Sequence, residues 1–581
     1  MGKAGVIAAL TLLTLLAPAS LSRAQTTAPL APSVSGPAPR TPVAAKDGMV
    51  VAEEARASRI GVEILQRGGN AVDAAVAVGF ALAVTLPNAG NLGGGGFMLV
   101  RIARENKIAA IDYRETAPAG VKTNIFLNWL GEADPKKSRD EGLAVGVPGT
   151  VSGLALAHQK YGSGKFTLAE LIAPAIKLAR EGIFVDPELV ASLARSKPVL
   201  ERWPSTASIF LRTDGSVPRV GELLVQRDLA DTLEEIAERG PRSFYDGRIA
   251  GQIAASVQAA GGVLTREDLA RYQAVERAPV AGNYRGYDIF SMPPPSAGGV
   301  HLIQILNILE GYDLSVLGPA SIQGAHLMVE AMKIAYADRA RFLGDPEFVR
   351  VPVAGLLSSA YAAELRKRIE PERALRAEEL TGSNPAAHEG DHTTHYSIVD
   401  RDGNAVANTY TLNLWYGTGL VADGTGILLN NELDDFAAKP GAPNAFGLVG
   451  GTANAPGPGK KPLSSMAPTI VLKNGKLFLV TGSPGGSRII STLVNVLVNL
   501  IDHRMNLAEA TAAPRIHHQW LPDEVRVEPG VRPDIVSVLQ SRGNRVARGE
   551  PWGSASSIMV TKDGLVGAAD PRSRGALALG F

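Results

Sequence analysis

The hydrophobic pattern of this chain changes character at Thr393. From residue 149 to about residue 376, apolar side chains recur mainly at helical spacing. From Thr393 onward, residues 393–399 and 405–412 alternate between apolar and polar and flank a polar turn at 400–404, which predicts a β-hairpin. Strands mixed with long helical blocks, without a regular strand–helix–strand repeat, predict an α+β fold built in layers.

A second constraint on the fold comes from residues 71–84. They follow Asn70, which stands where a helix N-cap is expected. These residues are mostly Ala, Val, Leu and Gly, so the predicted helix is apolar on all sides and should be buried. A glycine-rich stretch follows, and residues 97–102 and 108–113 then predict two antiparallel strands that close at Arg114.

Composition excludes several classes of function. The chain has no cysteine, which excludes thiol catalysis and thiolate metal sites. The net charge of +1 gives no electrostatic footprint for nucleic acid. The nine histidines show no His-Glu-x-x-His spacing, and adjacent His517 and His518 point their rings apart on a helix or a strand, so no metal site is predicted.

The N-terminus has the three parts of a secretory signal peptide. Lys3 is followed by an apolar run at residues 8–16 and by a small-residue exit at Ser22-Arg23-Ala24, so we expect residues 1–24 to be removed on export to the periplasm or the medium. The apolar run is shorter than the ~20 residues that a membrane span needs. We expect no membrane span in the mature protein. Residues 25–47 are rich in Pro, Ala, Ser and Thr and predict a flexible tether.

Two common catalytic loops fit poorly. Thr481-Gly482-Ser483-Pro484-Gly485 lacks the first glycine of a Gly-x-Ser-x-Gly serine hydrolase turn, and the loop also lacks the Gly-Lys-Ser/Thr ending of a phosphate loop. What remains is Thr393-Thr394-His395-Tyr396-Ser397. Taken alone, this stretch is typical of the start of a strand, which threonine favours.

Together with other motifs in the same order, however, this stretch resembles the bacterial γ-glutamyltransferases. The resemblance runs from about Gly48 to the C-terminus. Its further motifs are Gly90-Asn91-Leu92-Gly93-Gly94-Gly95-Gly96-Phe97, Asp112-Tyr113-Arg114-Glu115, Asn404-Ala405-Val406-Ala407, Thr409-Tyr410-Thr411-Leu412-Asn413, Pro462-Leu463-Ser464-Ser465-Met466 and Gly482-Ser483-Pro484-Gly485-Gly486-Ser487-Arg488.

The resemblance implies an N-terminal nucleophile hydrolase with a four-layer αββα fold and no cofactor. The precursor is expected to cleave itself between His392 and Thr393, giving a heterodimer of a large subunit (48–392) and a small catalytic subunit (393–581) that share one core. Cleavage frees an α-amino group with a pKa near ~7.7–8.0, so Thr393 would supply both nucleophile and general base. Thr411 matches the second threonine, whose hydroxyl bonds to the nucleophile.

The same resemblance implies a pocket for a γ-glutamyl group. Arg114, Ser464 and Ser465 match the residues that bind its α-carboxylate, for which a guanidinium is well suited. The ammonium-binding positions match Asn413, Glu432 and Asp435, and the oxyanion-binding amides match Gly485 and Gly486. The expected donors are glutathione and other γ-glutamyl compounds, and the expected acceptors are water, amino acids and peptides.

Two departures from the family pattern concern the pocket walls. Residues 440–459 match a lid loop, but Phe446 stands where the family usually has Tyr, so it can cover the site only by packing. Leu414-Trp415-Tyr416 is bulkier than the family pattern and is expected to shape the side facing the acceptor or leaving group.

Two alternative functions stay open. A glutaryl or cephalosporin acylase of the same family would bind a substrate without the α-ammonium, leaving Glu432 and Asp435 facing nothing cationic. A non-catalytic exported binding protein would remain uncleaved.

Overall fold

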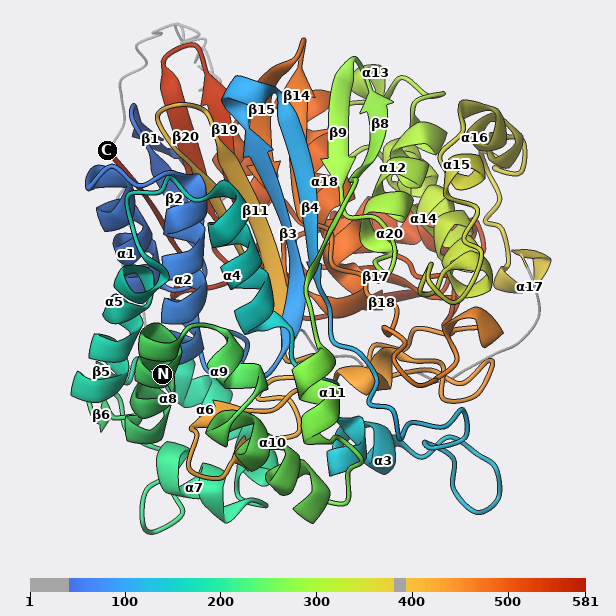
Figure 1. Ribbon diagram of the computed structural model, residues 1–581. Helices are drawn as coiled ribbons and strands as arrows, with labels where there is room; N and C mark the ends of the chain where they lie inside the picture. The colour runs from blue at the N-terminus through green and yellow to red at the C-terminus, as the bar shows by residue number, and fades with distance from the viewer. Residues whose placement is uncertain (1–40, 381–392) are drawn as a thin grey trace, which may run out of the picture. The chain divides into compact units, whose positions relative to one another are not determined.

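Two seven-stranded antiparallel sheets form the centre of the computed structural model, which describes residues 41–380 and 393–581 (Figure 1). In the first sheet the strand order is β1 (Val43–Ala45), β20 (Gly564–Ala569), β19 (Ser556–Thr561), β15 (Lys476–Thr481), β14 (Thr469–Lys473), β9 (Tyr287–Ser291) and β8 (Val280–Tyr284). In the second sheet it is β21 (Leu577–Gly580), β2 (Met49–Ala52), β10 (Thr393–Val399), β11 (Ala405–Thr411), β3 (Gly95–Ile102), β4 (Lys107–Tyr113) and β7 (Val275–Arg277).

The predicted hairpin lies at the middle of the second sheet. Strands β10 and β11 pair in antiparallel register from Thr393 opposite Thr411 to Val399 opposite Ala405. Strand β2 pairs with the outer edge of β10, and β3 pairs with that of β11. The two strands that carry the predicted nucleophile and its partner are therefore held on both sides.

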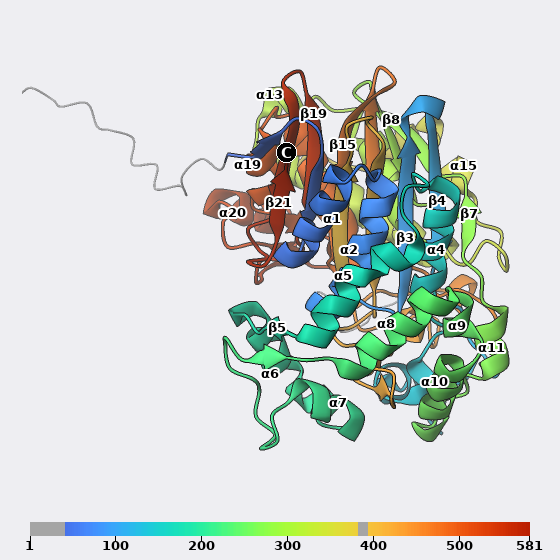
Figure 2. The same cartoon turned by 60° about the vertical axis from the view of Figure 1, so that its left-hand side comes forward.

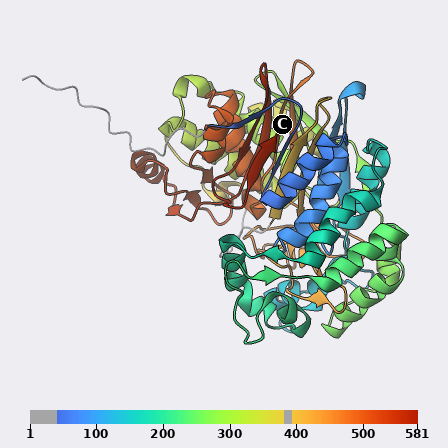
Figure 3. The same ribbon diagram turned by 90° about the vertical axis from the view of Figure 1, so that its left-hand side faces the viewer.

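Helices cover the outer face of each sheet. On one side α1 (Ala55–Gln66), α2 (Ala71–Thr85) and α4 (Thr150–Tyr161) pack on the second sheet, with α5 (Leu168–Glu181) and α8 (Arg227–Arg239) beyond them (Figures 2 and 3). On the other side α12 (Gly298–Leu309), α14 (Ile322–Phe342) and α18 (Ile489–Ile501) cover the first sheet. The predicted four-layer αββα fold is confirmed.

Helix α2 shows how composition fixes its place. All fifteen of its residues are buried, and the Asn70 side chain caps it by accepting from the backbone of Val72 and Asp73, as predicted. Because the helix is apolar on every side, it is stable only when covered on every side, and it lies between α1, α5 and the strands β10 and β11.

The alternation of side chains along β10 divides two cores. Tyr396 and Ile398 belong to the core between the second sheet and its helices, whereas Val399 belongs to the core between the two sheets. Since side chains of a strand alternate between its faces, Thr393 and His395 share the inter-sheet face with Val399.

The remaining helices lie outside these two layers or at their edges. They are α3 (Pro135–Arg139), α6 (Pro187–Leu200), α7 (Pro204–Phe210), α9 (Arg242–Tyr245), α10 (Arg248–Ala259), α11 (Arg266–Arg271), α13 (Leu314–Leu317), α15 (Val353–Leu356), α16 (Ser359–Arg366), α17 (Ala377–Leu380), α19 (Leu507–Ala512) and α20 (Pro533–Ser541). The strands outside the two large sheets are β5 (Ile183–Phe184), β6 (Leu223–Leu224), β12 (Val421–Ala422), β13 (Ile427–Leu428), β16 (Ile516–His517), β17 (Val525–Val527) and β18 (Val546–Arg548).

One boundary prediction is wrong. The tether predicted to end at residue 47 overlaps β1, whose three residues pair with β20, and the backbone of Lys46 and Asp47 donates to the carbonyl of Phe581. Main-chain pairing with a sheet edge does not depend on side-chain pattern, so composition gave no sign of it. The predicted signal peptide and His392 lie outside the described residues. Within residues 41–380 and 393–581, no helix is both long and apolar enough to cross a membrane.

Candidate active site

Thr393 begins β10 directly opposite Thr411, the last residue of β11. Only 7% of Thr393 is exposed, and Thr411 is almost fully buried. The Thr411 hydroxyl oxygen accepts from the backbone N–H of Asn413 at 2.9 Å, which fixes the start of the loop after the strand. The hairpin therefore brings the two predicted catalytic threonines together through local pairing alone.

A row of buried polar groups continues from Thr393 along the inter-sheet face. The ring of His395 bonds to the Thr409 hydroxyl at 2.7 Å and to the Ser397 hydroxyl at 3.1 Å, and Ser397 donates to the carbonyl of Ser556 in β19. Burial lowers the pKa of His395 to about 3, so the ring is neutral and links the strands rather than moving protons. This role of His395 was not predicted from the sequence, although the two-residue period places these side chains on one face.

A small cavity of about 20 Å³ lies beside Thr393, with room for about one water molecule. It is lined by all six predicted substrate-binding residues together with Thr393, Thr411, Gly486 and three apolar side chains. These residues are Arg114, Thr393, Thr411, Asn413, Glu432, Asp435, Phe446, Ser464, Ser465, Met466, Gly486 and Ile489. Of the predicted site residues that the structure describes, Gly485 alone is not among them.

Arg114 forms the buried wall of this cavity. It follows β4, is fully buried, and donates from Nε to the Pro462 carbonyl at 3.1 Å. Its two terminal nitrogens donate to the carboxylates of Glu432 and Asp435, the latter at 2.6 Å. Glu432 and Asp435 begin and end one turn of 3-10 helix, in which residues three apart are eclipsed, so both carboxylates face Arg114.

Burial and charge oppose each other in this cluster. Burial raises the pKa of Glu432 and of Asp435, while the Arg114 guanidinium pulls both down. Glu115, whose carboxylate lies 3.8 Å from Arg114 Nη1, has its pKa raised to about 7 by burial. A site with a buried cation between several carboxyl groups matches a ligand that brings both a positive and a negative group.

Two further residues hold side chains of the cavity lining in place. Arg339 in α14 donates to the Ser465 hydroxyl at 3.2 Å, and Asn444 donates to Asp435 Oδ1 at 2.8 Å. Neither residue was predicted from the sequence. The one available signal was that Arg339 falls within the helical block predicted from residue 149 to about residue 376, on the side that α14 buries, where an apolar residue is expected.

Gly485 and Gly486 turn the chain into α18 with φ values of 133° and 52°, which favour glycine. A Cβ on Gly486 would lie 2.4 Å from the Phe446 ring, so the missing side chain makes room for that ring. The Ser487 carbonyl accepts from the buried Tyr336 hydroxyl, which holds the loop against α14. The assignment of the two glycine amides as oxyanion donors stays a prediction.

Phe446 packs over the cavity, and its carbonyl accepts from Gln519 at 3.0 Å. Of the bulky residues after Asn413, Tyr416 turns away: its hydroxyl bonds to Ser192 at 2.8 Å and its ring packs against Phe210. The expectation that Tyr416 shapes the pocket is therefore wrong, because the positive φ of 61° at this residue directs the side chain into a separate apolar cluster. Trp415 instead lines a second cavity beside Thr393.

In the described part of the chain, no cluster of three or more His, Asp or Glu side chains is placed to hold a metal ion. The adjacent histidines point to different partners, as predicted. His517 bonds to Ser491 and Gln519, whereas His518 bonds to Asp523.

Comparison with known proteins identifies the family. The model of the gamma-glutamyltranspeptidase family matches residues 57–580. The chain belongs to this family. It is 54% identical over 542 residues to the glutathione hydrolase proenzyme of Escherichia coli K12, covering 93% of each protein. The family resemblance and the enzyme class predicted from the motifs are confirmed.

Acylases of the same family are also similar. The chain is 38% identical to the Acylase ACY 1 proenzyme of Pseudomonas sp. SE83, covering 92% of this chain and 94% of that protein. The crystal structure of cephalosporin acylase from Bacillus halodurans superposes with a TM-score of 0.81 at 30% identity, covering 95% of this chain and 99% of that one. Both matches span nearly the whole molecule, so they support the fold without separating the two activities.

Proposed function

We propose that this member of the gamma-glutamyltranspeptidase family cleaves itself between His392 and Thr393 and then hydrolyses or transfers the γ-glutamyl group of glutathione and related compounds. The observation that carries this proposal is the meeting of Thr393 and Thr411 with Arg114, Glu432 and Asp435 around one buried cavity. No single fragment holds the site, because Arg114 precedes the cleavage point and the other residues follow it.

In the proposed reaction the freed α-amine of Thr393 takes the proton of its own hydroxyl while Oγ attacks the γ-carbonyl carbon. Backbone N–H groups of Gly485 and Gly486 stabilise the oxyanion. The C–N bond breaks, the leaving amine takes the proton, and an ester remains on Thr393 Oγ. Water then releases glutamate, or the amine of an amino acid or peptide forms a new γ-glutamyl amide. Both routes return the proton to Oγ.

Binding of the γ-glutamyl group is proposed as an exchange of partners. Arg114 is bound by Glu432 and Asp435. The substrate α-carboxylate replaces these acids on Arg114, with the hydroxyls of Ser464 and Ser465 beside it. The α-ammonium then takes the two released carboxylates, with Asn413 nearby. Since the zwitterion is neutral overall, the net charge of the buried site is unchanged by binding.

The acylase alternative is less well supported by this charge arrangement. The carboxylate of a glutaryl group would replace Glu432 and Asp435 as the partner of Arg114. It would leave these two buried carboxylates without a cation, which is costly. The test is hydrolysis of γ-glutamyl-p-nitroanilide beside glutaryl-p-nitroanilide by the purified mature protein. We expect a higher kcat/KM for the γ-glutamyl compound. A preference for the glutaryl compound would overturn the assignment.

The maturation steps belong to the same proposal. Residues 1–24 serve as a signal peptide that directs the chain to the periplasm, and cleavage before Thr393 divides it into a large subunit that ends at His392 and a small subunit (393–581). Support comes from the three-part N-terminal pattern and from a family whose relatives are named as proenzymes.

A further inference from the structure

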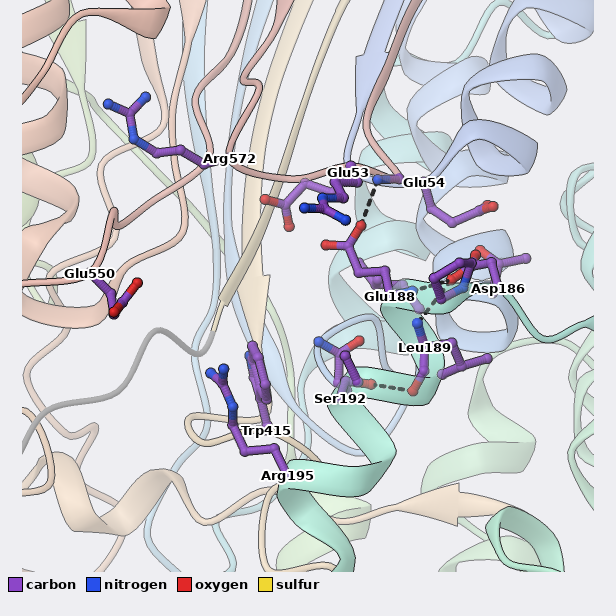
Figure 4. Close-up of a pocket in the computed structure, with 17 residues that line it drawn as sticks. Glu53, Glu54, Asp186, Glu188, Leu189, Ser192, Arg195, Trp415, Glu550 and Arg572 are labelled. Atoms are coloured by element: carbon purple, nitrogen blue, oxygen red, sulfur yellow. Dashed lines mark hydrogen bonds between the residues drawn. The ribbon is translucent and has the colours of Figure 1, made fainter. Parts of the chain in front are cut away.

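A second, larger space opens beside Thr393, away from Arg114. One cavity of about 270 Å³ includes Thr393, and it adjoins another of about 490 Å³ (Figure 4). Glu53, Glu188, Arg195, Trp415 and Arg572 line both, so the two form one continuous space, termed here the Trp415 cavity. Among the described residues, Thr393 alone lines both the Trp415 cavity and the Arg114 cavity.

Two of the charged side chains in the Trp415 cavity are already bound within the protein. Glu188 accepts from the backbone N–H of Gly575 at 2.6 Å and from the Ser573 hydroxyl at 3.3 Å. Arg572 donates to the carboxylates of Glu528 and Asp570, and its hydrogen bond to Asp570 is 3.0 Å long. These two groups hold the C-terminal segment in place and have little capacity left for a ligand.

Arg195 is different. It is exposed on α6, and no carboxylate of the described residues lies within 4.0 Å of its guanidinium. The guanidinium carbon lies 4.9 Å from the centre of the Trp415 ring, a cation–π contact that holds the charge at the cavity. Figure 4 shows Arg195 and Trp415 side by side at one end of the space, with Glu53 and Arg572 at the other.

Glu53 supplies a carboxyl group near Thr393. It lies just after β2 and is 7% exposed, with the hydroxyls of Thr394 and Ser554 near its carboxyl group. Burial raises its pKa to about 8, because these two hydroxyls only partly replace the lost water. The space thus has a carboxyl group at the Thr393 end and a guanidinium held against an indole ring at the far end.

We propose that the Trp415 cavity binds the amino acid or dipeptide that leaves or accepts the γ-glutamyl group, with Arg195 binding its free carboxylate. This inference rests on the proposed function and deepens it. The acyl group occupies the Arg114 cavity, so an attacking amine must approach Thr393 from the other side. A carboxylate pairs with two guanidinium N–H groups at once, and the Trp415 ring gives the acceptor side chain an apolar surface.

The geometry also accounts for both directions of transfer. In the forward step the amine of cysteinylglycine leaves the γ-carbonyl carbon with the proton from Thr393 Oγ while its carboxylate stays on Arg195. In the second step an acceptor amine forms a C–N bond to that carbon, the ester C–O bond breaks, and the amine proton passes to Oγ. One carboxylate site serves the leaving group and the acceptor.

The test compares two acceptors that differ only in the carboxylate. Transfer from γ-glutamyl-p-nitroanilide is measured with glycylglycine and with glycylglycinamide, in the wild type and in Arg195→Gln. We expect the wild type to prefer glycylglycine, and the ratio of the two kcat/KM values to fall about tenfold in Arg195→Gln, as loss of a charge-assisted pair implies. Because the ratio is taken within one variant, loss of folded enzyme cancels.

Lys197→Gln is the matched control, since Lys197 is on the same helix, pairs with Glu201 and does not line the cavity. It should keep the wild-type ratio. An unchanged ratio in Arg195→Gln would overturn the proposed subsite. Failure of the wild type to cleave γ-glutamyl-p-nitroanilide would instead contradict the proposed function itself, so the two failures are distinguished.

Discussion

Arg114 is the residue on which the proposed donor site depends most. It is fully buried, and it is bonded to two carboxylates that are themselves buried. Taking three charged groups out of water is costly, and pairing repays this cost only with good geometry. A protein fold gains little from such an arrangement, whereas a binding site gains a set of charges ready to exchange partners with a zwitterion.

Arg114→Lys tests this reading. Lysine keeps the positive charge but cannot reach two oxygens of one carboxylate in a fixed plane. We expect the donor KM for γ-glutamyl-p-nitroanilide to rise by about 10–100-fold, equivalent to about 1.4–2.7 kcal/mol of lost binding. Thermal unfolding of the same sample checks that the protein is folded. A folded variant with the wild-type KM would contradict the role assigned to Arg114.

Glu53 gives a prediction about pH. Its folded-state pKa of about 8 lies above the ordinary value of 4.5, so the folded protein holds a proton that the unfolded chain releases. The stability from this group is therefore complete below about pH 4.5 and is lost as pH rises through about 8. Relative to the wild type, Glu53→Gln should have a smaller fall in melting temperature between pH 6 and about pH 9. Equal falls in both proteins would show that Glu53 is not protonated in the fold.

At the scale of elements, the site joins a hairpin to a glycine loop. The hairpin was predictable because its register depends on the polar turn at residues 400–404, which is local in sequence. Two other contacts could not be predicted, those of Asn444 with Asp435 and of Arg339 with Ser465. Each joins segments that only the packed fold brings together. The residues that line the cavity were predicted from the motif resemblance, because hydrophobic periodicity alone does not identify them.

The glycine loop should be sensitive to a single methyl group. In Gly486→Ala the new Cβ would lie 2.4 Å from the Phe446 ring, at a φ of 52° that disfavours alanine. Movement of the loop misplaces the proposed oxyanion donors, and loss of one such donor costs about 10²–10³-fold in kcat. We expect a fall of this size in hydrolysis of γ-glutamyl-p-nitroanilide.

Gly475→Ala is the control for backbone strain. Gly475 has a similar φ of 73° in the turn between β14 and β15, but nothing lies within 4 Å of its added Cβ. This variant should lose a little stability and keep wild-type kcat. If both variants lost activity equally, strain alone would account for the effect and the role of the loop in catalysis would be unsupported.

At the scale of the whole molecule, the proposed subunits are interleaved. In the second sheet β10 and β11 come after Thr393, yet they lie between β2 and β3, which come before it. Cleavage of one peptide bond leaves these ladders and both apolar cores intact. The two fragments therefore have no separate cores to fold around.

This interleaving predicts that the cleaved fragments stay together under native conditions. Size-exclusion chromatography should give one peak containing both, and only denaturant should separate them. Mixing the two fragments after separate expression should restore little activity, because each would expose sheet edges that favour aggregation. Independent elution of two folded fragments would contradict the shared core.

The central claim is that Thr393 becomes an N-terminal nucleophile, and intact mass measurement with N-terminal sequencing tests it most directly. Wild-type protein should give two chains, the smaller beginning Thr393-Thr394-His395-Tyr396-Ser397, and Thr393→Ala should remain one uncleaved chain without activity. A wild-type protein that remains whole yet hydrolyses γ-glutamyl amides, or a small chain that begins at another residue, would contradict the account.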